Sequence, residues 1–389
     1  MPMERRTFLQ SAACLPLASN LWPSNTTSTP ATRLSAKGRH HFFGYYGINP
    51  WDRGKRYHLA LETDFDDRIP TINDQAQVGL VDVRSSRFIP LTKTNAFNFQ
   101  QGSMMHWIDA GFGEEFVYNA SEGSSLHSYA MNRQTGEKRK INAAVAAVSP
   151  NGREAIGLHY LRMWYCRKEV GYANDLPELE QSLMPPQDGL FAIDLATGKD
   201  ELLLPFTEVA RHPAFNITVN GLMWFNHVLY NPSGRRLLFF CRVKTGKNWA
   251  TSLWTVNRDG SGLQCQIPFG HWISHFDWKD DRTILITSDL LGEKYFLEFT
   301  DGKKEYTPIG KGILTSDGHC SYSPDGRYIL SDAKVAGGEH PKAEVFLYDL
   351  AKGEKRSLGV FDQDIKRTAV IRCRSEEHKS ELQSRQVIS

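Results

Sequence analysis

Ser321-Tyr322-Ser323-Pro324-Asp325-Gly326-Arg327-Tyr328-Ile329-Leu330 is the stretch that decides the fold of this chain. It joins a short strand to an apolar, alternating strand through a Pro-Asp-Gly turn, which is the pattern of a β-hairpin. A hairpin of this kind recurs every ~40 to 80 residues, which indicates a fold built from copies of a single unit. The further copies, some of them degenerate, occur at 49–55, 107–111, 148–156, 230–239 and 278–285.

A second repeated pattern follows the hairpins, namely a strand that ends in a charged turn. The clearest examples are at 190–198 and 345–353, and the same pattern occurs at 128–136 and 253–260. Each unit therefore consists of strand, Pro-Asp-Gly turn, strand, strand, charged turn and strand. Six such units occupy about residues 40–363, and four-stranded units repeated in this way are typical of propeller blades. We predict an all-β fold, a seven-bladed β-propeller whose seventh blade is truncated.

The end of the chain departs from the propeller pattern. After Cys373 comes Arg-Ser-Glu-Glu-His-Lys-Ser-Glu-Leu-Gln-Ser, which closely resembles the translation of a common sequencing adapter. We interpret 374–389 as a non-native tail and assign 38–373 to the propeller. The alternative is a genuine polar tail. A propeller left open at this end would expose strand edges.

The first residues resemble a twin-arginine export signal. Glu-Arg-Arg-Thr-Phe-Leu-Gln at 4–10 precedes an apolar stretch at 11–21 and a linker rich in Ser, Thr and Pro at 23–37. We assign 1–37 to an export signal and linker and expect a periplasmic or secreted protein. The alternative is a disordered tail with a chance arginine pair. No other stretch approaches the ~18 apolar residues that a membrane span needs, so none is expected.

Charge and motifs argue against several classes of protein. The formal net charge is +2, which implies no strongly basic surface, so no nucleic-acid partner is expected. The chain contains no P-loop, no dinucleotide-binding fingerprint, no His-Glu-x-x-His and no Gly-x-Ser-x-Gly. Its six cysteines form no Cys-x-x-Cys pair, which argues against a zinc ribbon.

Three histidines occupy the same position in consecutive units. His227, His275 and His319 each stand three residues before the aromatic residue that leads into the turn. This offset puts the aromatic side chain and the histidine on opposite faces of the innermost strand, so the histidines can point into the channel. Neutral imidazole is a common ligand of divalent metals, and three protein ligands leave a position open for a substrate oxygen. The pattern indicates a metal site, and the alternative is three unrelated structural histidines.

An insertion of about 28 residues separates the second and third strands of the third unit, near 160–190. Loops at this position lie at the channel mouth, and loops on a rigid scaffold often carry function. We therefore expect its aromatic and basic side chains to rim the channel. The candidate catalytic residues of the insertion are Arg162 and Tyr172, and the candidate substrate-binding residues are Tyr160, Trp164 and, further along the chain, Arg211.

Two more histidines lie in the second unit. His106 stands next to the first strand, and His127 begins the third strand. For either residue alone, a structural and a functional interpretation are about equally good. Together with Tyr172 they form a candidate acid–base set, because His and Tyr are suitable groups for proton transfer.

With these residues the chain resembles known propeller lyases. Channel histidines from successive blades resemble those of oligogalacturonate lyase, in which histidines hold a catalytic divalent metal. His106 and His127, followed by Tyr172 in a loop, are similar to the propeller ulvan lyases, and the blades look like those of TolB-type propellers. The resemblance implies a divalent metal (Mn, Zn or Ca) as cofactor. It also implies an anionic polysaccharide or oligosaccharide, containing uronic acid, as the partner.

The reaction implied by the resemblance is β-elimination, which removes the proton beside a uronic carboxylate and expels the 4-linked sugar. A metal on the three channel histidines would stabilise the enolate-like state. His127 and Tyr172 would transfer protons, and His106 would neutralise the carboxylate or share the role of base. Two alternatives are a non-catalytic, TolB-like periplasmic binding propeller and a glycoside hydrolase, which needs two carboxylates facing a cleft. The arginines that could neutralise the carboxylate are Arg162, Arg211 and Arg242.

Overall fold

The computed structural model of the chain describes residues 33–35, 38–109, 113–123, 125–177, 181–335 and 342–362. The expected non-native tail and almost all of the expected export signal and linker lie outside these residues, so both assignments stay predictions. Within the described ranges, no helix is long and apolar enough to cross a membrane.

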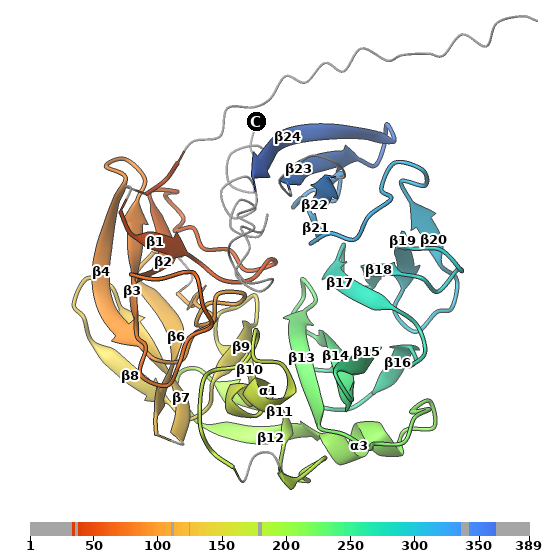
Figure 1. Cartoon of the computed structure of the whole chain (residues 1–389), viewed down its shortest axis with the longest axis horizontal. Coiled ribbons are helices and arrows are strands. Elements are labelled where there is room, and N and C mark those ends of the chain that lie inside the picture. Colours follow the sequence, from red (N-terminus) through yellow and green to blue (C-terminus); the bar gives the residue numbers. More distant parts are fainter. Residues whose placement is uncertain are drawn as a thin grey trace, which may run out of the picture.

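The described residues form six four-stranded antiparallel sheets, arranged as blades around a common centre (Figure 1). The fold is an all-β propeller, as predicted, but the prediction of seven blades was wrong. The six sheets correspond to the six hairpin units of the sequence. The expected seventh blade had no hairpin of its own, because no further Pro-Asp-Gly copy follows the sixth unit.

Each blade is a meander in which strands adjacent in sequence are adjacent in the sheet. The first three blades comprise β1 (His40–Phe42), β2 (Tyr57–Thr63), β3 (Ala76–Asp82) and β4 (Arg87–Thr94); β5 (His106–Trp107), β6 (Glu115–Glu122), β7 (Ser125–Asn132) and β8 (Lys138–Ile141); and β9 (Val145–Val148), β10 (Glu154–Gly157), β11 (Gly189–Asp194) and β12 (Asp200–Pro205). The last three comprise β13 (Met223–Tyr230), β14 (Arg236–Thr245), β15 (Asn248–Asn257) and β16 (Gln264–Ile267); β17 (Ile273–Trp278), β18 (Thr283–Ser288), β19 (Tyr295–Thr300) and β20 (Thr307–Ile309); and β21 (Ser321–Tyr322), β22 (Tyr328–Val335), β23 (Lys342–Asp349) and β24 (Glu354–Asp362). Helices α1 (Tyr160–Cys166) and α3 (Phe206–Arg211) lie in the connections between strands.

The Pro-Asp-Gly turns form as the sequence predicts. In the sixth blade, Ser323 Oγ donates to Asp325 Oδ1 (2.5 Å), and the Gly326 N–H donates to the Ser323 carbonyl (2.8 Å). Gly326 has a φ of +67°, a left-handed conformation that glycine adopts without steric cost. These turns lie where the first strand of each blade ends, and we call that side of the propeller the turn face. We call the opposite side, where the first strands begin, the entry face.

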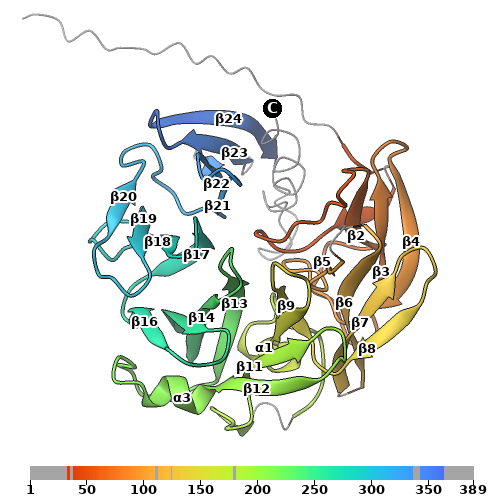
Figure 2. The same cartoon turned by 180° about the vertical axis from the view of Figure 1, so that it is seen from behind.

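A segment of the first blade enters the centre of the propeller. After β1 the chain runs inward at 43–48, as the two opposite views of Figures 1 and 2 show. The Tyr46 ring lies among the predicted channel histidines, with centroid distances of 4.7 Å to His227, 5.6 Å to His275 and 5.4 Å to His319. The middle of the channel is therefore occupied by an aromatic ring.

The insertion between β10 and β11 does more than rim the channel mouth. Its helix α1 packs into a large apolar cluster. Tyr160 of this helix stacks on Tyr172 with ring centroids 4.6 Å apart, and both side chains are buried. Arg167, which follows α1, lines a cavity on the entry face. The insertion thus contributes mainly to the core and brings one cation to the channel opening.

Candidate functional site

Two of the predicted channel histidines form a close pair at the entry face. His275 lies in β17 and His319 lies just before β21, and their ring centroids are 3.9 Å apart. His275 Nδ1 is 3.0 Å from Asp317 Oδ1, and His319 Nδ1 is 2.9 Å from Asp332 Oδ2. A carboxylate at Nδ1 places the proton there and leaves the lone pair on Nε2. Each imidazole is thus held in the tautomer that can accept a proton.

The third channel histidine is separated from this pair by Tyr46. The Tyr46 hydroxyl lies 3.0 Å from His227 Nδ1 and accepts the backbone N–H of Phe276 (3.1 Å). The His227 ring stacks on Phe276 at 4.2 Å. The backbone φ of +51° at His227 coincides with an irregularity in the pairing of β13 with β14. Its side chain lines a cavity on the turn face.

The predicted three-histidine metal site does not form in the described part of the chain. No three His, Cys, Asp or Glu side chains there are grouped so that they could hold a metal ion. The Tyr46 ring contacts all three histidines, and its hydroxyl is hydrogen-bonded to Nδ1 of His227. The remaining pair, His275 and His319, offers two nitrogen ligands, which is fewer than a typical protein site for a divalent metal supplies. A metal therefore does not fit these residues in the way that the sequence predicts.

Arg242 is a buried cation with no carboxylate partner among the described residues. It lies in β14, is 8% exposed, and donates from Nη1 to Asn226 Oδ1 (2.8 Å). Its Nε is buried without a hydrogen-bond acceptor in the described structure. The guanidinium lies 5.0 Å from the ring of Phe240 and 5.7 Å from that of Trp249. Buried charges are normally paired, so this guanidinium is suited to an anion that comes from outside the chain.

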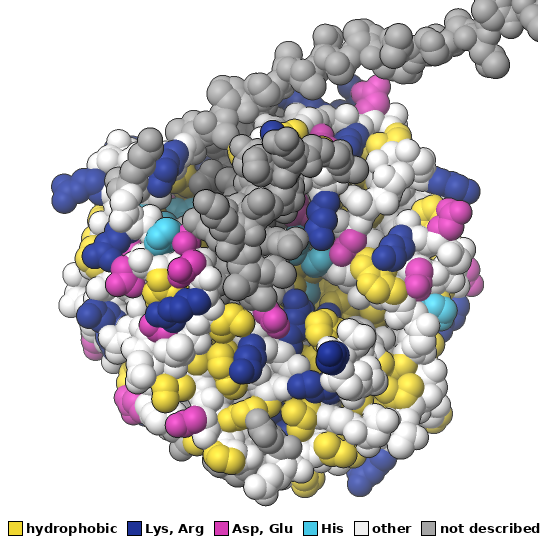
Figure 3. All heavy atoms as spheres, viewed as in Figure 1, with side chains coloured by type: hydrophobic (Ala, Val, Ile, Leu, Met, Phe, Trp, Pro, Cys, Tyr) yellow, Lys and Arg dark blue, Asp and Glu magenta, His cyan; other side chains and the backbone are white. Residues whose placement is uncertain are grey.

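Arg242 and the histidine pair line one cavity of about 360 Å³ on the entry face. We call it the arginine pocket and define it by Arg167, Arg242, Trp249, His275 and His319. Aspartates that hold the two imidazoles also line it. In the space-filling view of Figure 3, Lys and Arg side chains and Asp and Glu side chains both lie around the middle of the propeller. This pocket combines the chemistry expected of a site for an acidic ligand.

The charges in the arginine pocket decide which groups are protonated. Burial and the neighbouring His319 lower the pKa of His275, although Asp317 raises it, so His275 is neutral at neutral pH. Burial opposes ionisation of Asp317, but the two histidines outweigh it and hold its pKa below the usual value. Burial, and then the charge of Arg167, lower the pKa of Arg242 to about 9. The pocket therefore combines a neutral imidazole, an ionised carboxylate and a poorly compensated guanidinium.

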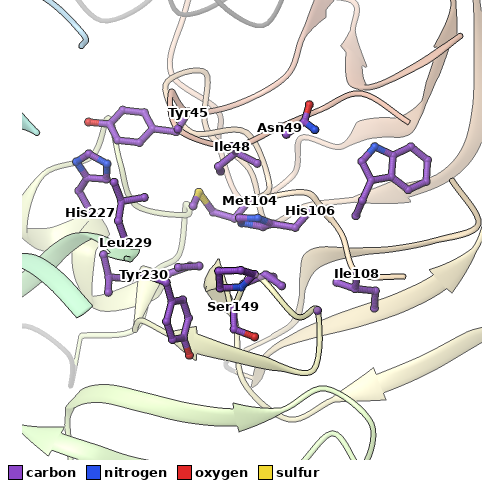
Figure 4. Close-up of a pocket in the computed structure, with 18 of the residues that line it drawn as sticks. Tyr45, Ile48, Asn49, Met104, His106, Ile108, Ser149, His227, Leu229 and Tyr230 are labelled. Atoms are coloured by element: carbon purple, nitrogen blue, oxygen red, sulfur yellow. The ribbon is translucent and has the colours of Figure 1, made fainter. Parts of the chain in front are cut away.

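A second cavity, of about 460 Å³, lies on the turn face (Figure 4). We call it the neutral pocket and define it by Tyr45, Gln101, Met104, His106 and His227. Tyr45 also lines the arginine pocket, so it stands between the two cavities. Burial lowers the pKa of His106 to about 3 and holds that of His227 well below its ordinary value. Both imidazoles are therefore uncharged at neutral pH.

The predicted acid–base set is not brought together by the described structure. His106 lines the neutral pocket, whereas His127 lies two strands away in β7 with its Nε2 3.9 Å from Glu122 Oε1. The Tyr172 hydroxyl accepts a hydrogen bond from Asn119 Nδ2 (2.8 Å), and burial raises its pKa well above the ordinary value. Among the described residues, no hydrogen bond joins any two members of this set.

The other predicted site residues lie away from the arginine pocket. Arg162 is buried and donates to two backbone carbonyls at 3.0 and 2.7 Å, which makes it part of the core. Tyr160 lines the neutral pocket. Trp164 is half-buried, with the Lys168 ammonium 5.1 Å from its ring centroid. Arg211 is exposed at the end of α3 and pairs with a glutamate of the same helix (2.9 Å).

Several site residues were missed by sequence reasoning. Asp317 stands two residues before His319, and this Asp-Gly-His spacing is a signal that could have identified it. Asp332 lies in β22 and accepts the backbone N–H of His319 as well (2.9 Å), a pairing that depends on the blade geometry. Arg167 and Tyr46 reach the channel from distant parts of the chain, and no local pattern marks them.

Comparisons with known proteins bear on the fold. No protein-family model and no curated protein sequence matches the chain. An oligogalacturonate lyase in complex with manganese matches with a TM-score of 0.57 at 15% identity, over 83% of this chain and 79% of that one. An oligogalacturonate lyase from Vibrio parahaemolyticus matches with a TM-score of 0.56 at 14% identity, over 84% of this chain and 80% of that one. TolB from Acinetobacter baumannii matches with a TM-score of 0.39 at 12% identity, over 80% of this chain and 71% of that one.

At these identities, the likeness to the two oligogalacturonate lyases shows a shared propeller fold. A fold by itself does not fix an activity, because unrelated functions are built on the same propellers. The activity of this chain therefore depends on the residues that line its own cavities.

Proposed function

We propose that this propeller binds an oligosaccharide or polysaccharide containing uronic acid in the arginine pocket and cleaves it by β-elimination. The observation that carries the proposal is the buried Arg242 guanidinium, which has no carboxylate partner in the described part of the chain and lies beside two imidazoles held by aspartates. A uronic carboxylate would supply the missing anion. The shared fold with oligogalacturonate lyases supports this class of ligand.

Arg242 would bind the substrate and activate it. A guanidinium matches a carboxylate with two parallel N–H···O bonds. During elimination, negative charge develops on the carboxylate oxygens as the proton on the neighbouring carbon is removed. A guanidinium placed there stabilises that state, and its burial against Phe240 and Trp249 strengthens the interaction by excluding water.

His275 is the proposed base. It is neutral, and Asp317 at its Nδ1 leaves the Nε2 lone pair able to take the proton from carbon. The electrons of the C–H bond form the new C=C bond, and the C–O bond to the 4-linked sugar breaks. The imidazolium that forms is stabilised by Asp317. His319, whose ring lies 3.9 Å away, positions the His275 ring.

The leaving oxygen needs a proton when the C–O bond breaks. Tyr45 lines the arginine pocket and carries a phenol that can donate to this oxygen. The proton that His275 has taken then returns to Tyr45 through solvent, which restores both groups. No step of this scheme is routed through a metal, because the described residues do not form a three-ligand group.

Glycoside hydrolysis fits the arginine pocket less well. Asp317 and Asp332 both line the pocket, but each is bonded to an imidazole. A glycosidase needs one carboxylic acid whose pKa is raised so that it can protonate the leaving oxygen. The pKa of Asp317 is instead held below its usual value.

The test is to incubate the protein with pectin fragments, ulvan, alginate and glycosaminoglycans while the ultraviolet absorbance of the unsaturated product is followed. A rise on one polymer that disappears in Arg242→Met would support the proposal. Arg235→Met is the matched control, because Arg235 is exposed and pairs with Asp281 far from the pocket. Binding of a uronic oligosaccharide without any absorbance rise would replace the lyase by a binding propeller. Neither binding nor cleavage would overturn the proposal.

A further inference from the structure

We propose that the neutral pocket on the turn face is a second binding site, which takes an uncharged sugar ring. Three of the residues that line it each carry a buried polar atom with no hydrogen-bond partner in the described structure, namely Gln101 Oε1, His106 Nε2 and His227 Nε2. Buried polar groups in proteins are nearly always hydrogen-bonded. Three unbonded atoms around one cavity therefore point to a ligand that bonds to all of them. This inference does not rest on the proposed lyase activity.

The three atoms offer one acceptor and two imidazole nitrogens, each of which can donate or accept. The Tyr46 hydroxyl accepts the Phe276 N–H and is hydrogen-bonded to His227 Nδ1, and the tautomer of His227 decides whether its Nε2 donates or accepts. Gln101 Oε1 is an acceptor. The tautomer of His106 is not fixed by any hydrogen bond in the described structure. Hydroxyl groups both donate and accept, so a ligand with several hydroxyls satisfies the whole set.

The neutral pocket offers no positive charge to a ligand. Both histidines are uncharged, and no Lys or Arg lines the cavity. Two aspartates at its edge already accept backbone N–H groups. Asp277 accepts those of Trp278 and Tyr322 (both 2.8 Å), and Asp109 accepts that of Glu115 (3.1 Å). An anion finds no counter-charge here, so the pocket would reject the uronic acid that the arginine pocket is proposed to bind.

The walls and size of the neutral pocket suit a sugar ring. Ile48, Met104 and Leu158 give it apolar surface, and Tyr230 and Trp278 add aromatic rings. Sugars present C–H faces that pack on such surfaces. A volume of about 460 Å³ lies within the usual range for small-molecule sites, about 300 to 1,000 Å³. A wholly apolar ligand fits less well, because the buried nitrogen and oxygen atoms would stay unbonded.

Figure 4 shows how the recognising groups are distributed around the cavity. His106 comes from β5 of the second blade and His227 from β13 of the fourth blade, so the site is assembled from separate blades. The positions of both side chains are fixed by strands rather than by loops. Such a site is largely formed before the ligand arrives, which lowers the entropy lost on binding.

The experiment uses ligand-detected saturation-transfer NMR on the full chain, with galactose, xylose, rhamnose and glucuronate as probes. We expect at least one neutral sugar to bind, and His106→Leu to weaken that binding by about tenfold or more because a buried hydrogen bond is lost. His127→Leu is the matched control. His127 is a buried histidine of the same blade whose Nε2 also lacks a hydrogen bond in the described structure, but it does not line the pocket.

The two pockets can be separated in the same experiment. Arg242→Met should keep the binding of the neutral sugar, whatever it does to glucuronate. His227→Asn gives a second test if His106→Leu does not fold, because Asn tolerates the left-handed φ of +51° at this position. If no neutral sugar binds a cooperatively folded wild-type protein, the proposal is overturned and the three atoms are bonded to water alone. Equal weakening by His127→Leu would also overturn it.

Discussion

The arginine pocket and the neutral pocket lie at the two ends of one channel, yet their electrostatics are opposite. The arginine pocket holds an uncompensated guanidinium and two imidazoles bonded to aspartates. The neutral pocket holds two uncharged imidazoles, and none of the carboxylates in the described structure bonds to them. Both pockets nevertheless use histidines from the same register position of successive blades.

The difference between the pockets lies in what bonds to Nδ1. At the entry face, Asp317 bonds to His275 Nδ1, so the Nε2 lone pair is available and the protonated ring is stabilised. At the turn face, His227 Nδ1 bonds to the Tyr46 hydroxyl instead of a carboxylate, and burial keeps the ring neutral. One residue type in one repeat position is thus proposed as a base where a carboxylate bonds to it, and as a neutral hydrogen-bonding group where a hydroxyl does.

The largest effect is expected for Arg242→Met. Removing the guanidinium should lower turnover of the uronic substrate by about 10²- to 10³-fold, because a group that stabilises the transition-state charge is lost. The same change removes an unpaired buried charge, so the free energy of unfolding should stay the same or rise. Product absorbance and urea unfolding measure the two effects. A fall in both would mean that Arg242 acts in the fold rather than in the site.

Asp317→Asn should have the next largest effect. Turnover should fall by about 10²-fold, because the protonated form of the base loses its carboxylate partner. Activity needs neutral His275, so it is present above the pKa of His275 and is lost as the pH falls through that pKa. Asp317 raises this pKa, so Asp317→Asn should move the acid limb of the pH–rate profile to lower pH. An unmoved acid limb would remove His275 from the role of base.

The fold could be predicted because its determinants are local. A Pro-Asp-Gly turn such as that at Gly326 forms wherever its own residues allow it, and each copy of the hairpin became the first half of one blade. The prediction of a seventh blade was wrong because that blade was expected from the propeller pattern rather than from a hairpin in the sequence. The number of hairpin copies alone would have predicted six blades.

The site could be predicted only in part. The shared register of His227, His275 and His319 predicted that their side chains meet in the channel, and all three contact one tyrosine ring. The path that brings Tyr46 between them depends on packing across the centre, which no local pattern encodes. The burial of Arg242 likewise depends on how the blades pack, so the sequence left it as one of three arginines.

Tyr46→Phe tests how much the hydroxyl at the boundary of the two pockets stabilises the fold. It leaves the Phe276 N–H and His227 Nδ1 without their partner, so the free energy of unfolding should fall by about 1 to 3 kcal/mol. Urea unfolding measures the change. Tyr230→Phe is the control, because the Tyr230 hydroxyl makes no hydrogen bond in the described structure and its loss should change little. Equal effects of the two variants would show that the Tyr46 hydroxyl contributes no special stability.

The smallest effect concerns acid stability, and it tests the neutral pocket by itself. Burial lowers the pKa of His106 from 6.5 to about 3, so between these values the unfolded chain binds a proton that the native protein does not. His106 therefore makes the protein less stable as the pH falls below about 6.5, by at most ~1.4 kcal/mol per pH unit. His106→Leu should remove this loss, so at pH 5.5 its stability relative to pH 7 should exceed that of the wild type by about 1 kcal/mol.

The matched control for acid stability is His58→Leu. Burial lowers the pKa of His58 to about 4, but this residue packs against Trp51 and Phe43 and lines neither pocket. Both variants should flatten the dependence of unfolding free energy on pH, while only His106→Leu should also weaken neutral-sugar binding. If His106→Leu left the pH dependence unchanged, His106 would take up a proton in the native protein, and the turn-face cavity would then carry positive charge. The opposition between the two pockets would be lost, because an anion could bind at either end of the channel.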